Sequence, residues 1–289
     1  MNEKIIYSFG SFTYDLIENH KGISKYCVGG SNAYFSLSSS IVGLKTYPVG
    51  YISDDIDYTI RKKLSDFIDL KYLKTGKKLN FHIIYNENLE ANYLKDLDEN
   101  DEVIDCKDLP KSDYAHVCVI SSIKNQMDII EYYKKLGSFV STGTYLIRIK
   151  KDRDTVLKML NMCDLFFLNK EESFALSNEK NFNDVINFFV KTRKKVIITL
   201  GKNGAIFIEN KNFLKVDAIN VDVVDVTGAG ETFAGAFVSS YILYNDPYLS
   251  LKYGVILSSF VIEDFGINGL LNIKRDLLLK RLEELNVWN

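Results

Sequence analysis

Short apolar runs alternate with helical patterns through residues 114–200, and this alternation constrains the fold more than any other feature of the chain. The apolar runs are Ala115–Ile120, Phe139–Ser141, Leu165–Leu168 and Val196–Leu200. The helical patterns between them are Gln126–Leu136, Thr155–Leu160 and Asn183–Val190. Strands that alternate with helices form a parallel sheet whose two faces are both covered by helices. The sequence therefore predicts an α/β fold with three layers, α/β/α, around a mostly parallel central sheet.

Composition favours one large domain. With 46% hydrophobic residues among 289, the chain can bury a large core, and no internal repeat or low-complexity linker marks a second domain, so residues 1–289 are taken as one. The 36 basic and 38 acidic residues nearly cancel, which argues against nucleic acid or a membrane as partner. The sequence shows neither a signal peptide nor a bilayer-length apolar run, so we expect a cytoplasmic protein.

Cysteine and histidine give no sign of a metal centre. The four cysteines, Cys27, Cys106, Cys118 and Cys163, are far apart and form no Cys-x-x-Cys pair, so we expect buried free thiols. The three histidines show no metal-ligand spacing and are expected to be structural.

A glycine-rich turn spans Asp225–Phe233, between the β-branched run Ile219–Val224 and a helical pattern. Its small residues leave backbone N–H groups uncovered at a helix N-terminus, where these donors and the helix dipole favour an anion. Glu231 lies at the edge of this turn, where an acid could accept the proton of a nucleophile that attacks a bound phosphate. The alternative is an ordinary turn in which Thr227 caps the helix.

The whole nonamer resembles the C-terminal signature of the ribokinase-like (PfkB) family of carbohydrate and nucleoside kinases, Asp-Thr-x-Gly-Ala-Gly-Asp-x-Phe. It also falls late in the chain, as it does in that family. The resemblance implies a ribokinase-like fold in which Glu231 replaces the catalytic Asp as base. Gly228, Ala229 and Gly230 would donate N–H groups to the phosphoryl, and Thr227 would contact the nucleotide.

Residues of the N-terminal part resemble the substrate side of the same family. A short strand ending at Gly10 is followed by Asp15, in the place of the sugar-binding Asp; the alternative is a solvated loop acid. Paired glycines before a helix let a ligand approach the backbone closely. The implied substrate-binding residues are Asp15, Gly29, Gly30, Asn32 and Tyr34, although the family commonly has Asn at the position of Tyr34.

The family also carries a small β-sheet lid over the substrate. Residues 11–26 and 79–112 are the matching segments of this chain, with short strand patterns and turns. Lids of this kind close on the ligand and exclude water. The lid sheet is also the expected contact of a homodimer, while the alternative is a plain surface excursion.

The implied nucleotide-binding residues lie at the predicted carboxyl ends of parallel strands. Ligand sites of such sheets are found at these strand ends. Asn169 and Glu172 match the family's Asn-x-x-Glu motif, which implies that Glu172 supports Mg²⁺; the alternative is an acid-rich helix N-terminus. The other implied nucleotide contacts are Thr199, Gly201, Gly204, Gly266 and Asn268. The alternative is that the apolar residues around Gly266 and Asn268 only pack in the core and do not flank a nucleotide.

The resemblance is weaker after Phe139. Ser141 and Thr142 stand where the family often has an Asp, so the local contacts to phosphate or substrate are in doubt. Arg148 could contact substrate or phosphate, but we expect it on the surface.

The implied function is transfer of the ATP γ-phosphate to a hydroxyl of a sugar or nucleoside. ATP and Mg²⁺ are the expected cofactors, and a monovalent cation such as K⁺ could bind near Asp225–Thr227. One alternative is a family member that binds nucleotide or metabolite without turnover. Another is a dinucleotide oxidoreductase, which is disfavoured because Gly10 is not followed by Gly-x-x-Gly at the start of a helix.

Overall fold

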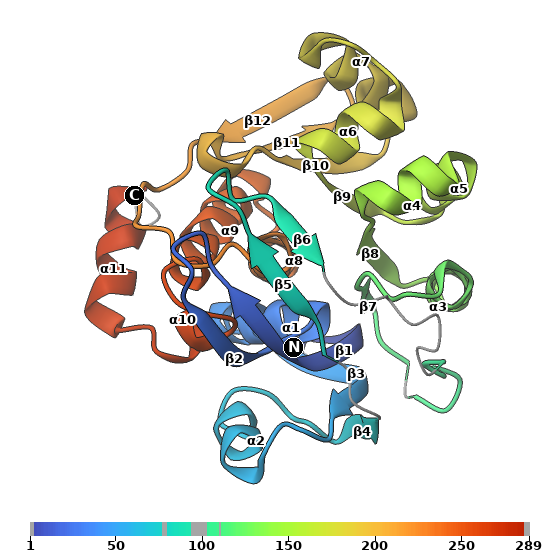
Figure 1. Cartoon of the computed structure of the whole chain (residues 1–289). Coiled ribbons are helices and arrows are strands. Elements are labelled where there is room, and N and C mark those ends of the chain that lie inside the picture. The colour runs from blue at the N-terminus through green and yellow to red at the C-terminus, as the bar shows by residue number, and fades with distance from the viewer. Residues whose placement is uncertain (1–2, 77–79, 94–102, 110, 286–289) are drawn as a thin grey trace.

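The computed structural model describes residues 3–76, 80–93, 103–109 and 111–285. Its strands form a 12-stranded sheet whose main path runs β12-β11-β10-β9-β8-β7-β1-β3-β4 (Figure 1). The strands are β1 Ile5–Glu18, β2 Ser24–Gly29, β3 Lys45–Ser53, β4 Tyr72–Gly76, β5 His82–Tyr85, β6 Ala91–Tyr93, β7 Tyr114–Val117, β8 Phe139–Gly143, β9 Leu165–Asn169, β10 Lys195–Thr199, β11 Ala205–Glu209 and β12 Asn212–Val216. Neighbours from β4 to β10 are parallel, while β10, β11 and β12 pair antiparallel.

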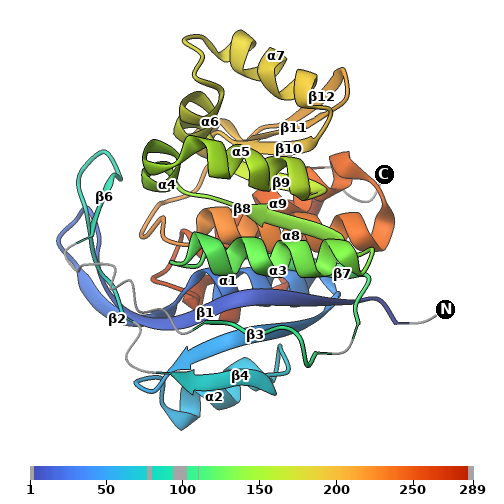
Figure 2. The ribbon, with the colours of Figure 1, turned by 90° about the vertical axis from the view of Figure 1, so that its right-hand side faces the viewer.

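Helices cover both faces of this sheet. They are α1 Ser31–Val42, α2 Tyr58–Ser65, α3 Ile123–Lys135, α4 Leu146–Lys151, α5 Arg153–Met162, α6 Lys170–Ser177, α7 Phe182–Thr192, α8 Ala229–Tyr244, α9 Pro247–Val261, α10 Asn268–Leu271 and α11 Arg275–Glu284, with a 3₁₀ turn at Gly201–Asn203. Figure 2 shows α3, α4 and α5 in front of the strands and α1, α8 and α9 behind them. The predicted three-layer α/β/α fold is confirmed.

The strand β9 shows why both faces must be covered. Phe166 and Leu168 point into the core beneath α3, α5 and α7, whereas Leu165 and Phe167 point into the core beneath α1, α8 and α9. All four side chains are almost fully buried, so every position of the run is apolar. A strand with this pattern is stable only between two layers of helices.

A smaller sheet rises from the end of β1. Residues Ile5–Phe12 of β1 pair with β3 in the main sheet, and Thr13–Glu18 pair with β2 and then β5, which in turn pairs with β6. One continuous strand thus belongs to both sheets (Figure 2). We name the part formed by Thr13–Glu18, β2, β5 and β6 the lid.

The lid covers only part of the ranges expected from the sequence. Residues 79, 94–102 and 110 of the second range lie outside the described residues. Ile104 and Cys106, from the same range, are buried in the main core beside Val49 and Val117 rather than in the lid.

Several elements differ from the sequence prediction. The hairpin β11–β12 was not predicted from the sequence. The helix α2 begins at Tyr58 because the Asp57 side chain caps it and accepts the Ile60 N–H. All four cysteines are buried and free, as predicted.

Candidate active site

The candidate site lies where strands of the main sheet end at the N-terminus of α8. The register pairs Asn169 with Thr199, so the ends of β9 and β10 meet at the same edge. Asp15 comes from the lid part of β1, and Gly29 pairs with Thr13 beside it. Carboxyl ends of parallel strands are the usual place for ligands in such a sheet.

The glycine-rich turn places Gly228, not Thr227, before the first residue of α8. Gly228 has φ 74° and offers no side-chain cap, so the predicted alternative of a Thr227 cap is wrong. A Cβ at Gly228 would lie 2.4 Å from the Tyr34 ring, whereas one at Gly230 would meet nothing within 4 Å. The turn is therefore closed from below by Tyr34 and open above Gly230.

The hydrogen-bond donors of this turn are the backbone N–H groups at the N-terminus of α8. The Ala229 N–H makes a long bond of 3.3 Å to the Val226 carbonyl, and the first bond of α8 joins Thr232 N–H to the Gly228 carbonyl. The N–H groups of Gly230 and Glu231 belong to the first turn, where donors have no intrahelical backbone acceptor, although the Glu231 N–H also interacts with the carboxylate of the same residue. An anion above Gly230 would satisfy them.

Glu231 stands in this first turn with its side chain partly buried. Burial raises the pKa of the Glu231 carboxyl above its usual range. Burial raises the pKa values of Glu172 and of the Cys118 thiol, and the charge of Glu231 adds to both shifts, so both groups lie within electrostatic reach of it. A carboxyl whose pKa moves toward neutrality is suited to general base catalysis.

Asn169 and Glu172 form a capping box at the start of α6. The Glu172 carboxylate accepts bonds of 2.8 Å from both the backbone and the side-chain nitrogen of Asn169, and Asn169 Oδ1 accepts the Glu172 N–H. Burial, aided by the charge of Glu231, raises the pKa of Glu172 to about 8. A cation beside these carboxyls would favour their charged form, so the donor set fits Mg²⁺, which binds few carboxylates besides phosphate oxygens and water.

Asp15 is 2% exposed and lies on the inner face of the lid. It accepts the Thr13 hydroxyl at 2.7 Å and the Phe81 N–H at 2.9 Å, and a Cβ at Gly29 would come within 2.3 Å of its Oδ2. Glycine at position 29 therefore makes room for this carboxyl. Asp15 is not the solvated loop acid that was the alternative.

A second buried carboxyl, Asp225, organises the chain just before the turn. It accepts the N–H and hydroxyl of Thr227 at 2.9 and 2.6 Å and the Gly266 N–H at 3.0 Å. Its charge raises the pKa of Asp15, and its own pKa is raised by burial. Among the described residues no Lys or Arg pairs with either acid, which fits the expectation of a cation near Asp225–Thr227.

Two further predicted substrate-binding residues, Asn32 and Tyr34, have different surroundings. Asn32 is fully buried and its amide donates to the carbonyls of Ser8, Gly10 and Val49, so it ties β1 to β3. Tyr34 lies beneath Gly228, and its buried hydroxyl has no hydrogen-bond partner among the described residues. Tyr34 thus adjoins the turn, whereas Asn32 has a structural role.

The remaining predicted nucleotide residues lie at two loops. Thr199 ends β10, and Gly201 and Gly204 form the turn into β11, where the Leu200 N–H bonds the Gly204 carbonyl. A Cβ at Gly201 would meet nothing within 4 Å, so this turn is open to a ligand. Asn268 is partly exposed at the start of α10, two residues beyond Gly266.

A buried polar cluster lies at the ends of β7 and β8, and the sequence did not reveal it. Arg148 is 5% exposed, so its predicted surface position is wrong. Its guanidinium donates to the carbonyls of Ile120 and Ser121 and to Gln126, which also bonds the Thr142 hydroxyl at 2.8 Å. Thr142, where an Asp is usual, is therefore part of a network that fixes the strand ends.

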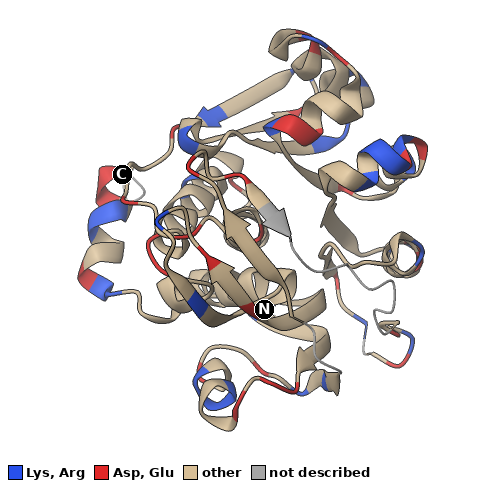
Figure 3. Ribbon diagram, in the orientation of Figure 1, with Lys and Arg blue, Asp and Glu red and all other residues tan. Residues whose placement is uncertain are grey.

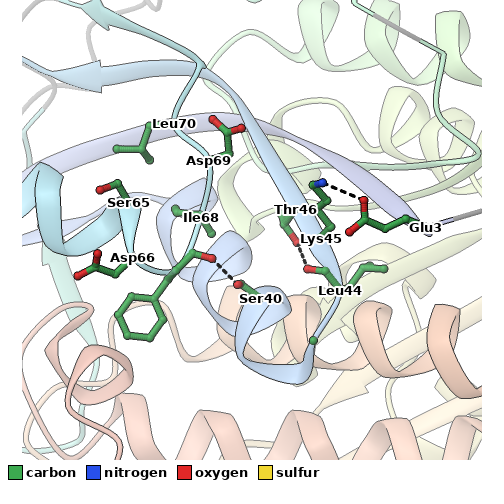
Figure 4. A pocket seen from close by; sticks show the side chains of 12 residues that line it. Glu3, Ser40, Leu44, Lys45, Thr46, Ser65, Asp66, Ile68, Asp69 and Leu70 are labelled. Carbon is green, nitrogen blue, oxygen red and sulfur yellow. Dashed lines mark hydrogen bonds and ion pairs between the residues drawn. The ribbon is translucent and has the colours of Figure 1, made fainter.

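Other features of the described residues lie away from this site. No group of three His, Cys, Asp or Glu side chains there could by itself hold a metal, and no described helix is long and apolar enough to cross a membrane. A cavity of about 550 Å³, lined by Glu3, Lys45 and Phe67 among others, opens at the amino end of β3 (Figure 4). The cavity thus lies at the amino ends of the parallel strands, whereas the candidate site lies at their carboxyl ends.

Comparison with known proteins agrees with this geometry. A model of the pfkB family of carbohydrate kinases matches residues 60–273, which is most of the chain. The chain belongs to the pfkB family of carbohydrate kinases. The resemblance stated from the glycine-rich turn is thereby confirmed, and the pfkB-family signature of the chain is the turn that forms the candidate site.

Relatives of this pfkB-family chain act on different sugars. A ribokinase from Lactococcus lactis is 32% identical over 117 residues, which are 40% of this chain and 38% of the ribokinase. An ATP-dependent 6-phosphofructokinase from Thermoanaerobacterium thermosaccharolyticum is 23% identical over 92% of each chain. The first of these alignments thus spans well under half of the ribokinase.

The fold is shared with solved structures. A fructokinase double mutant from Vibrio cholerae O395, crystallised with fructose, ADP and a potassium ion, superposes with a TM-score of 0.80 over 96% of this chain and 98% of the fructokinase. Its sequence identity of 18% makes this a likeness of fold.

The pH dependence of stability tests the burial of Asp15. Burial raises the pKa of Asp15 to about 7, so the folded chain binds this proton more tightly than the unfolded chain does. Its stabilising contribution is full below the unfolded pKa of about 4 and is lost as the pH rises through about 7. We expect the urea midpoint to fall between pH 5 and pH 8 by more in the wild type than in Asp15→Asn.

The exposed Asp222 provides the matched control. Asp222→Asn should keep the wild-type dependence on pH, because this substitution at the surface leaves the buried Asp15 in place. Equal slopes for the wild type and Asp15→Asn would show that Asp15 is hydrated in solution.

Proposed function

We propose that this chain transfers the γ-phosphate of ATP to a hydroxyl group of a sugar or nucleoside, with Glu231 as the general base. The observation that carries the proposal is the position of Glu231 in the first turn of α8, beside the N–H donors of Gly230 and Glu231. An anion site and an acid at its rim are the two groups that phosphoryl transfer requires from the protein.

The reaction would proceed at the open side of the turn. The hydroxyl oxygen attacks the γ-phosphorus, the bond to the bridging oxygen of ADP breaks, and Glu231 accepts the hydroxyl proton. The turn donors and the positive end of α8 stabilise the charge on the transferred group. Mg²⁺, held by Glu172 and Asn169 through its water shell, would neutralise charge on the phosphates. The proposed nucleotide contacts remain Thr199, Gly201, Gly204, Thr227, Gly266 and Asn268.

Charge favours a substrate without a phosphate group. The described acids of the site, Asp15, Asp225, Glu172 and Glu231, form none of the described ion pairs. Figure 3 shows Lys and Arg on helices such as α2, α4, α5 and α11, which carry none of these four acids. A phosphate monoester beside Asp15 and Asp225 would meet two like charges, whereas a neutral hydroxyl could donate to either. Asp15 and Gly30 are therefore proposed to face a neutral sugar or nucleoside.

ADP release, measured with ATP and Mg²⁺ over a panel of substrates, tests this function. We expect one class among the pentoses, hexoses and nucleosides to stimulate release, and fructose 6-phosphate and fructose 1-phosphate to remain at the rate without substrate. Stimulation by a sugar phosphate alone would contradict the charge argument.

The second candidate is a protein that binds nucleotide without turnover. It is favoured by the Glu at position 231, since one extra methylene displaces the carboxylate by about 1 Å, which can cost roughly 100-fold in rate. A panel without any ADP release, with ATP still raising the melting temperature, would support this candidate.

A homodimer through the lid is also proposed. Tyr26 on β2 and the preceding Ile23 are 60% and 54% exposed, and large exposed apolar side chains on one small sheet are typical of a contact surface.

A further inference from the structure

A hydrogen bond joins the lid directly to the glycine-rich turn. Tyr85, the last residue of β5, places its hydroxyl 2.8 Å from Thr227 Oγ1, across 142 residues of sequence. Tyr85 is 7% exposed, and Thr227 is partly exposed. Thr227 directly precedes Gly228, whose positive φ turns the chain into α8.

The direction of this bond follows from its neighbours. The Thr227 hydroxyl has one proton and donates it to Asp225 Oδ1 at 2.6 Å. Tyr85 must therefore be the donor, and a chain of bonds runs from Tyr85 through Thr227 to Asp225. Asp225 also accepts the N–H groups of Thr227 and Gly266, so the chain ends on the group that fixes this segment.

Apolar packing brings the same parts together. Ile17, Ile83 and Tyr85 of the lid form a cluster with Cys27 and Phe265, and Val224 and Val226 pack against it. The inner face of the lid thus lies on the residues that flank Asp225. Movement of the lid away from the main sheet would break both this contact and the bond between Tyr85 and Thr227.

We infer that Tyr85 is a positioning residue that couples lid closure to the geometry of the anion-binding turn. With the lid closed, Tyr85 holds Thr227, and Gly228–Glu231 are kept in place for the phosphoryl group. With the lid open, the Thr227 hydroxyl loses this donor and the turn loses one of its restraints. The inference rests on the proposed function, because it assigns the turn to a transferred phosphoryl.

The test is a set of variants that remove single hydroxyl groups. Tyr85→Phe keeps the ring and its packing but not the donor, and we expect kcat to fall about tenfold with the KM for ATP changed by less than twofold. Combined with Thr227→Val, Tyr85→Phe should cost nothing further, because the acceptor is already absent. Combined with Thr227→Ser, which keeps the acceptor, it should again cost about tenfold.

Tyr14 provides the matched control within the lid. It lies on β1 and stacks on Tyr26 at 5.9 Å, on the side of the strand opposite to Asp15. Tyr14→Phe should leave kcat unchanged. Wild-type kcat in Tyr85→Phe, or an equal further loss in the Thr227→Val background, would overturn the inference.

Hydrogen exchange gives a readout that does not need turnover. We expect Mg²⁺ and ADP to slow exchange of the β5 amides in the wild type, and to slow it much less in Tyr85→Phe. Equal protection in both proteins, or none in either, would contradict the coupling. Absence of ADP formation with every substrate would refute the proposed function, and the exchange result would still decide whether Tyr85 couples lid and turn.

Discussion

Glu231→Gln is expected to lower kcat by about 10²- to 10⁴-fold, with ATP binding retained. The amide has nearly the shape of the carboxyl but cannot accept the proton of the attacking hydroxyl. Burial raises the pKa of Glu231, which favours its role as a proton acceptor, and an amide has no such basicity. Coupled ADP release gives kcat, and the shift in melting temperature with ATP gives binding.

Two further variants test whether the loss in Glu231→Gln comes from the missing proton acceptor. Glu231→Asp keeps a carboxylate one methylene shorter, and we expect it to retain more turnover than Glu231→Gln. Glu172→Gln is expected to change the dependence of the rate on Mg²⁺ concentration, because we propose that Glu172 supports the ion rather than the proton transfer. Wild-type kcat in Glu231→Gln would show that another group, or no group, accepts the proton.

Gly228→Ala is expected to abolish turnover and to destabilise the fold. At φ 74° an alanine costs about 1–2 kcal/mol of backbone strain. A Cβ would also lie 2.4 Å from the ring of the fully buried Tyr34, and such overpacking costs about 1–3 kcal/mol more. Together these terms should lower the melting temperature by about 10 °C, measured by calorimetry.

Gly230 provides the matched comparison two residues away. A Cβ at Gly230 would meet nothing within 4 Å and no positive φ is needed there, so Gly230→Ala should keep the wild-type melting temperature. A stable Gly228→Ala protein with normal kcat would mean that the turn and Tyr34 can separate at little cost, and that the anion site does not depend on this geometry.

Local sequence was enough to predict β7, β8, β9, β10, the helices α3, α5 and α7 between them, and the helix that follows the glycine-rich turn. Those elements depend on the period of apolar residues, which is a property of consecutive positions. The hairpin β11–β12 was missed because Ala205–Ile208 can be read as a buried strand or part of a helix until its pairing with β10 is known.

The candidate site also has some features that depend on local sequence and others that depend on distant contacts. The sequence by itself determined the turn at Gly228, the acid at its rim and the capping box of Asn169 and Glu172, because each is formed by residues within a few positions of one another. Only the tertiary structure decided that Arg148 is buried, because the strand-end carbonyls that it satisfies come from a different part of the chain.

Tertiary structure also decided the two contacts across the site. Asp15 lies close enough to Asp225 for one charge to act on the other, and Tyr85 reaches Thr227, although about 210 and 142 residues separate the partners. These contacts exist because β1 continues from the main sheet into the lid and carries β5 with it. Sequence periodicity fixes which face of a strand is buried, but the path of a strand between two sheets depends on what packs against it.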